Sequence, residues 1–157
     1  MADQIPKTIR FWESRLENRG LLCKEGEEVS KDWYQDIVDF MTAIEQHKEK
    51  VPKEPSQEIV DLRVSLIDEE VNKELLKAME IGDLPGIADG IADSMYVHIG
   101  AAVAYGIDLR PIWDTVHEAN MKKVGGPVRE DGKRLKPKEW VPPDIKGELI
   151  KQGWNGK

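Results

Sequence analysis

The chain has 157 residues, of which 39% are apolar and 34% are charged, and its formal net charge is −7. This length suits one hydrophobic core, so we expect residues 1–157 to form a single domain. An acidic chain lacks the basic face that broad nucleic-acid binding requires. It can still act on nucleotides, because clustered carboxylates hold divalent cations that in turn attract phosphates.

Neither a membrane span nor a secretion signal stands out. The longest uncharged run, residues 94–107, is too short and too polar to cross a bilayer. Residues 1–10 carry charge but no apolar signal-peptide core. Cys23 is the single cysteine, which excludes an intrachain disulfide. We therefore expect a cytoplasmic protein.

Apolar residues at three- and four-residue spacing predict helices along most of the chain. The first is a short helix over residues 7–19. The second covers residues 31–48, with Ser30 or Asp32 as its N-cap. The apolar side chains that this second helix should bury are Trp33, Ile37, Phe40, Met41 and Ile44.

Two prolines in the charged connector 49–55 end that pattern. A long helix is then expected over residues 56–81, followed after a short turn by a helix over 84–105. The second of these is rich in alanine and glycine, and such small residues let another helix approach closely. Asp108 should cap a last core helix over residues 109–122.

The pattern changes in residues 125–157, which are rich in glycine, proline and lysine and show no sustained periodicity. We interpret this part as an irregular C-terminal arm on a helical core that spans residues 31–124. The arm is either functional, wrapped around a partner subunit, or without fixed structure in part. The predicted fold is thus an all-α helical bundle.

Acidic residues recur at helical spacing on two consecutive predicted helices. The apolar stripe of the helix 56–81 continues into Glu70, and Glu74 follows one turn later. Asp89 and Asp93 lie four residues apart on the next helix. Because a short connection makes such helices antiparallel neighbours, the two acidic pairs can meet in one layer.

Carboxylates gathered in a small volume repel one another and are costly to desolvate. A hard divalent cation relieves this repulsion, and oxygen ligands suit Mg²⁺ or Mn²⁺. The spacing therefore indicates a metal site. The alternative interpretation is that these residues are surface acids on solvated helix faces.

Several motifs taken together resemble a known family. They read Leu62-Arg63-x-x-Leu66-Ile67-x-Glu69-Glu70-Val71, Ile87-Ala88-Asp89-Gly90-x-Ala92-Asp93, His117-x-Ala119-Asn120-Met121-x-Lys123, Glu130-Asp131-Gly132-Lys133-x-x-Lys136 and Trp140-Val141-Pro142-Pro143-Asp144. In these features, over about residues 32–145, the chain is similar to the all-α nucleotide pyrophosphohydrolases of the MazG and phosphoribosyl-ATP pyrophosphohydrolase-like superfamily, above all to its phage and bacterial branch.

This resemblance implies an Mg²⁺-dependent enzyme that forms homodimers or homotetramers. It would cleave the α–β phosphoanhydride of a nucleoside triphosphate, dGTP or another pool-shaping substrate, to monophosphate and pyrophosphate. The implied metal ligands are Glu70, Glu74, Asp89 and Asp93, and the implied catalytic residues are Glu69 and Glu70. The candidate phosphate contacts are Asn120, Lys123, Lys133 and Lys136.

The chain departs from the family's acidic spacing at two positions. Relatives of this type show E-E-x-x-E, but here Lys73 holds the third acidic position and Glu74 comes one place later. They also show E-x-x-D, but here Gly90 stands in the first position and Asp89 one place earlier. Two alternatives stay open: a hydrolase specific for phosphoribosyl-ATP, dUTP or dCTP, and a helical module that binds nucleotide or metal without turnover.

Overall fold

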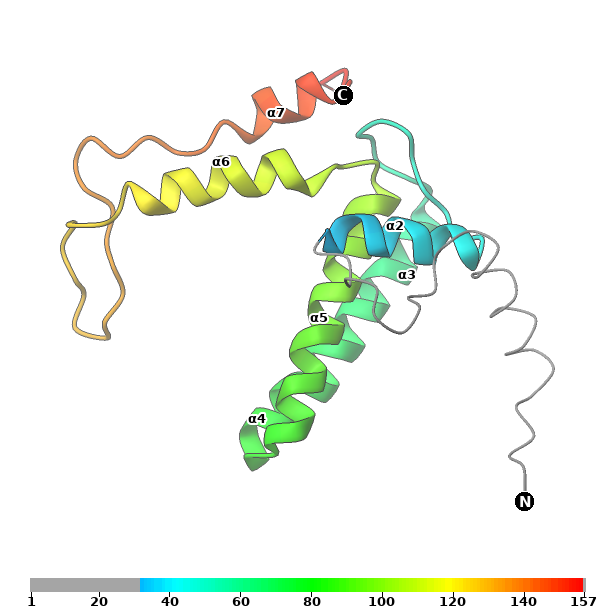
Figure 1. Cartoon of the computed structure of the whole chain (residues 1–157), viewed down its shortest axis with the longest axis horizontal. Helices are drawn as coiled ribbons and strands as arrows, with labels where there is room; N and C mark the ends of the chain where they lie inside the picture. The colour runs from blue at the N-terminus through cyan, green and yellow to red at the C-terminus, as the bar shows by residue number, and fades with distance from the viewer. Residues whose placement is uncertain (1–31, 157) are drawn as a thin grey trace, which may run out of the picture. The chain divides into compact units, whose positions relative to one another are not determined.

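The computed structural model describes residues 32–156, and the chain divides into two compact units, one up to Gln46 and one from His47 onward. The described residues form helices and one isolated β-bridge, with no strand among them, which confirms the all-α class (Figure 1). No helix in this part is both long and apolar enough to cross a membrane. The helix expected over residues 7–19 lies outside the described range, and the single-domain organisation stays a prediction.

The described helix of the first unit, α2, spans Trp33–Ala43 and is capped by Asp32, whose carboxylate accepts from the Gln35 N–H at 3.1 Å. The cap confirms one of the two expected N-cap residues. The helix ends at residue 43 and not at 48, so the predicted end was wrong. Glu45 adopts φ +58°, and the Gln46 N–H turns back to the Met41 carbonyl at 2.9 Å. This is a Schellman-type helix end with a glutamate in place of the usual glycine, so the sequence did not predict it.

Burial in α2 is narrower than its apolar pattern suggested. Ile37 and Met41 are buried as expected. Trp33 and Phe40 are 59% and 43% exposed, so the prediction that both are buried was wrong. Helical periodicity marks the side of a helix that is apolar, whereas burial also requires a neighbouring element that covers it.

A two-helix hairpin dominates the second unit (Figure 1). Its first arm is one continuous helix made of α3 (Gln57–Ile67), the π-helical segment η1 (Asp68–Leu75) and α4 (Leu76–Ile81). The second arm, α5 (Leu84–Ala104), packs against all three segments. Both helices are confirmed within a residue of their expected bounds.

The turn of the hairpin follows from local chemistry. Gly82 takes φ +72°, a left-handed conformation that glycine adopts without steric cost. Asp83 is the N-cap of α5, and a proline occupies the first turn of that helix, where the missing N–H costs no hydrogen bond. The short turn makes the two arms antiparallel.

The far end of α5 is held by the connector that precedes α3. Gly106 has φ +69°, and a Cβ at this position would lie 2.3 Å from the Val51 carbonyl oxygen. The Lys53 N–H donates to the Tyr105 carbonyl at 3.1 Å. After this contact α6 runs over Leu109–Met121, with Asp108 as its cap accepting from the Arg110 N–H at 3.0 Å. The predicted helix and cap are confirmed.

The C-terminal arm is more regular than its sequence suggested. It contains a short helix, α7 (Ile145–Lys151), which packs against α6, and an antiparallel bridge between Val128 and Arg134. The prediction of an irregular arm therefore missed a helix. Gln152 exchanges two hydrogen bonds, of 2.9 and 3.0 Å, with the backbone of Asp108. Such long-range pairing stabilises a seven-residue helix that local periodicity is too short to reveal.

Candidate functional site

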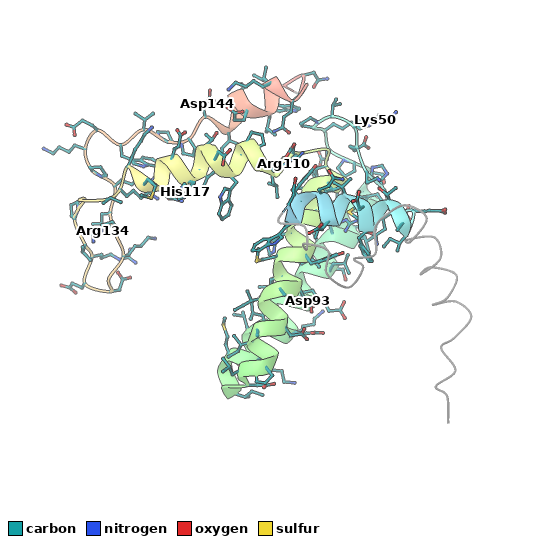
Figure 2. The ribbon with its side chains drawn as sticks, viewed as in Figure 1. Lys50, Asp93, Arg110, His117, Arg134 and Asp144 are labelled. Carbon is teal, nitrogen blue, oxygen red and sulfur yellow. The ribbon has the colours of Figure 1, made fainter. Side chains whose placement is uncertain are left out.

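The acidic residues singled out from the sequence lie on the two packed arms of the hairpin. Glu69, Glu70 and Glu74 belong to η1, and Asp89 and Asp93 belong to α5. Figure 2 labels Asp93 on α5. Since α5 packs most extensively against η1, the two acidic motifs face a common region. We refer to these five residues as the acidic cluster.

Glu70 is the centre of this cluster. Its side chain is half-buried, and burial raises the pKa of its carboxyl. The negative charges of Glu74, Asp93, Glu69 and Asp89, in decreasing order, raise that pKa further. All four other members of the cluster thus act on Glu70 across two helices, and protonation or a cation near Glu70 would relieve the repulsion.

The donor chemistry of the cluster suits a hard divalent ion, since every donor is a carboxylate oxygen. Glu69, Glu74 and Asp89 are exposed, whereas Asp93 is half-buried like Glu70. Within residues 32–156, no three acidic, histidine or cysteine side chains converge closely enough to hold a metal ion as they stand. The cluster therefore offers fitting ligands in one region, and an ion would have to draw their side chains together.

The acidic motif on the first arm lies in a π-helix, which the sequence did not predict. In such a segment backbone N–H groups bond five residues back rather than four, as the Leu76 N–H does to the Val71 carbonyl. The ion pair between Lys73 and Asp68, five residues apart, fits the same wide turn. The Lys73 ammonium lies 2.8 Å from an Asp68 carboxylate oxygen, and Asn72 donates to the other at 2.9 Å.

Gly90, where the family pattern has an acid, packs on the end of the π-helix. A Cβ at this position would lie 3.0 Å from both Cα and Cβ of Leu75. Real side chains are rarely that close, so a glutamate at residue 90 would force the two helices apart. The close approach expected for the small residues of α5 is confirmed here, and it explains why an acid at residue 90 does not fit.

Three of the four candidate phosphate contacts gather around Trp140. The Lys123 and Lys136 ammonium groups lie 5.5 and 4.0 Å from the centroid of its indole ring. Lys123 also donates to the Asn120 side-chain oxygen at 2.6 Å. The indole N–H donates to the Ala119 carbonyl at 2.7 Å and fastens the arm to the end of α6. We call Asn120, Lys123, Lys136 and Trp140 the lysine cluster.

Lys133 lies elsewhere, in the turn between Val128 and Arg134. Its backbone N–H donates to the Asp131 carboxylate at 3.1 Å, and its carbonyl accepts from Arg129 at 2.8 Å. Among the described residues, no hydrogen bond or ion pair joins the lysine cluster to the acidic cluster. The central position of Trp140 was not foreseen, although its Trp-Val-Pro-Pro-Asp sequence was part of the resemblance.

Comparison with known proteins gives one family. Residues 37–120 match the model of the family described as phosphoribosyl-ATP pyrophosphohydrolase. The matched stretch contains the complete hairpin with its acidic cluster and ends at Asn120. No curated protein matches the chain.

Proposed function

The chain belongs to the phosphoribosyl-ATP pyrophosphohydrolase family, and from this premise we propose that it is an Mg²⁺-dependent nucleoside triphosphate pyrophosphohydrolase. It hydrolyses the bond between the α and β phosphates of a ribo- or deoxyribonucleoside triphosphate, such as dGTP, and releases a monophosphate and pyrophosphate. The observation that carries this proposal is Glu70, a half-buried carboxylate on which the charges of four further carboxylates from two packed helices act.

In this proposal Glu70, Glu74, Asp89 and Asp93 hold the metal. Bound Mg²⁺ supplies positive charge that draws the triphosphate to an acidic surface and offsets the negative charge of the leaving pyrophosphate. Glu69 is exposed beside Glu70, which leaves its carboxylate accessible to water. Together with Glu70 it orients a water molecule and accepts its proton. The water oxygen bonds to the α phosphorus while the bond to the bridging oxygen breaks.

The lysine cluster is the proposed contact for phosphate oxygens. Lys123 and Lys136 place two positive charges over one indole ring, and Asn120 adds an amide that can donate to an anion. Lys133 stays a candidate on the neighbouring turn. The proposal allows the arm of one chain to serve the acidic cluster of a neighbouring subunit.

Exposed apolar side chains support a homodimer or homotetramer. Those on the hairpin that are more than two-fifths exposed include Leu76, Met79, Ile81, Leu84 and Ile91. Several large apolar side chains left exposed on one element are typical of a protein interface. The proposed enzyme acts on nucleotides in the cytoplasm.

The proposal is tested by measuring pyrophosphate release from the common nucleoside triphosphates with Mg²⁺. Glu70→Gln and Asp93→Asn should each lower turnover by about 100-fold or more, the range expected for loss of a group that stabilises developing charge. Glu80→Gln on α4 is the matched control, because it removes an exposed helical acid outside the cluster. Near-normal turnover of folded Glu70→Gln would refute the site.

The same assay addresses the lysine cluster. Lys136→Ala should raise the KM by about tenfold, as for loss of one charge-assisted hydrogen bond, with a smaller change in kcat. Lys138→Ala, two residues along the arm and exposed, is the control. An unchanged KM for Lys136→Ala would assign this lysine to the ordinary charged surface.

A second candidate is hydrolysis of phosphoribosyl-ATP, which the description of the matched family favours. This substrate has the same α–β bond, so its inclusion in the screen separates the two candidates by relative kcat/KM. Mg²⁺ binding without turnover of any of these compounds would favour the non-catalytic alternative.

A further inference from the structure

The spacing of the acidic motif and the π-helix that contains it have a common explanation. We infer that η1 accommodates one extra residue, Lys73, and that the widened turn places Glu74 beside Glu70 while directing Lys73 toward Asp68 and away from Glu70. The functional part of this inference rests on the proposed pyrophosphohydrolase activity. The structural part concerns the helix itself.

The position of Glu74 follows from the number of residues in a turn. In an α-helix a turn takes 3.6 residues, so a residue three places on falls just short of a full turn and a residue four places on falls just beyond it. Hydrogen bonds to the fifth residue widen the turn to more than four residues. Glu74, four places after Glu70, therefore falls short of a full turn. It takes the side of the helix that a residue three places on takes in an α-helix.

Lys73 provides an independent sign of the same widening. Its ammonium is 2.8 Å from the carboxylate of Asp68, five residues earlier. In an α-helix, residues five apart lie about 140° apart around the axis, so their side chains diverge. In η1 they lie on one side and form an ion pair. Lys73 thus occupies an acidic position of the family motif but pairs with Asp68, while the charge of Glu69 acts on it more weakly.

The packing of α5 fits this arrangement. Leu75, the last residue of η1, contacts Gly90 so closely that an added Cβ would lie 3.0 Å from the Leu75 Cα. Gly90 is the second position at which the chain departs from the family spacing. Gly90 therefore packs against the residue that follows Glu74, and Asp89, the residue before Gly90, carries the acid on α5.

The structural part is tested without metal or substrate, by deleting one residue at a time. Deletion of Lys73 should convert η1 into an α-helix with the following residues in nearly unchanged orientation. The thermal midpoint should then stay within about 3 °C of the parent value, the shift that corresponds to 1 kcal/mol in a chain of this size. Deletion of Ala92, an exposed residue in the regular helix α5, is the control. It should turn one part of that helix by about 100° and lower the midpoint by 10 °C or more, several times the shift above. Equal loss of stability in both variants would overturn the inference.

The functional part is tested by rescue, with Mg²⁺ binding followed by calorimetry beside pyrophosphate release. Glu74→Gln should weaken Mg²⁺ binding by about tenfold or more, as for loss of one stabilising contact of about 1.4 kcal/mol. Adding Lys73→Glu to this variant restores an acid at the family position in sequence, but its side chain should face Asp68. No recovery of Mg²⁺ binding is therefore expected, whereas recovery to the parent level would overturn the inference.

The results of these two tests distinguish a failure of the proposed function from a failure of the inference about Lys73. If Glu74→Gln leaves both Mg²⁺ binding and turnover unchanged, the proposed role of Glu74 in function is wrong, whatever the helix does. If Glu74→Gln has its effect but deletion of Lys73 unfolds the protein, the proposed function stands and the inference about the extra residue falls.

Discussion

Gly90 is the position at which a single methyl group tests the packing of the hairpin most directly. The variant Gly90→Ala adds a Cβ that would meet the Cα and Cβ of Leu75 at 3.0 Å and its backbone nitrogen at 3.3 Å. Two of these three atoms belong to the helix backbone. They cannot rotate away, so either the helices separate or the local packing is strained.

Two opposing effects determine the size of the change. Replacing glycine by alanine inside a helix stabilises it by about 1 kcal/mol. Overpacking a close contact costs about 1–3 kcal/mol. The net result is a loss of about 1 kcal/mol, and this corresponds to a fall in the thermal midpoint of about 2–4 °C.

Gly86→Ala is the matched control on the same helix. Its Cβ would meet the Asp83 carboxylate oxygen at 2.6 Å and the carboxyl carbon at 3.2 Å, but these atoms end a flexible side chain that makes no capping bond. The nearest atom of another residue is the Ala78 Cβ at 3.3 Å. The control should therefore be neutral or more stable by up to about 1 kcal/mol. Both variants are compared by thermal and urea unfolding at equal protein concentration. If Gly90→Ala proves as stable as Gly86→Ala, the close approach of α5 to η1 is refuted.

Two further outcomes are expected. Burial and the neighbouring carboxylates raise the pKa of Glu70 above its ordinary value of 4.5, so the folded state is favoured below that value and loses stability as pH rises through the raised pKa. Metal-free Glu70→Gln should therefore have a higher thermal midpoint than the parent protein at pH 7, and this difference should disappear below pH 4.5. An equal difference at both pH values would contradict the raised pKa of Glu70. In light scattering the protein should have the mass of a dimer or tetramer, because the exposed leucines, isoleucines and methionine of the hairpin need a partner; a purely monomeric species would exclude the proposed assembly.

Much of the fold could be read from local patterns. The caps Asp32 and Asp108 were visible because a short polar side chain before an apolar stripe satisfies the free N–H groups of a helix start. The ranges of the hairpin helices followed from their periodicity, and Gly82 and Asp83 marked the turn between them. Each of these features depends on residues within one or two turns of one another.

The candidate site was predictable only in part. The spacing of Glu70, Glu74, Asp89 and Asp93 indicated that acids on neighbouring helices would face one region, and the charges of the other three act on Glu70 in the structure. Their role as metal ligands stays a prediction. The spacing did not show that η1 is a π-helix. One extra residue in a helical sequence can be absorbed by a wider backbone turn, or it can rotate the following side chains around the axis of a regular α-helix. The amino-acid sequence is the same in both cases.

The sequence alone therefore determined the all-α class, the helical hairpin and the identity of its acidic residues, because these depend on side-chain chemistry and on repeats within single helices. Only the three-dimensional structure decided the hydrogen-bond register of η1, the contact of Gly90 with Leu75 and the contacts of two lysines with the Trp140 ring. The contacts of Gly90 and Trp140 depend on how separate segments pack, and the register of η1 is a choice that the same local sequence pattern leaves open. The acidic cluster depends on sequence and tertiary structure together, because the sequence supplies its carboxylates and the packing of α5 on η1 brings them into one region.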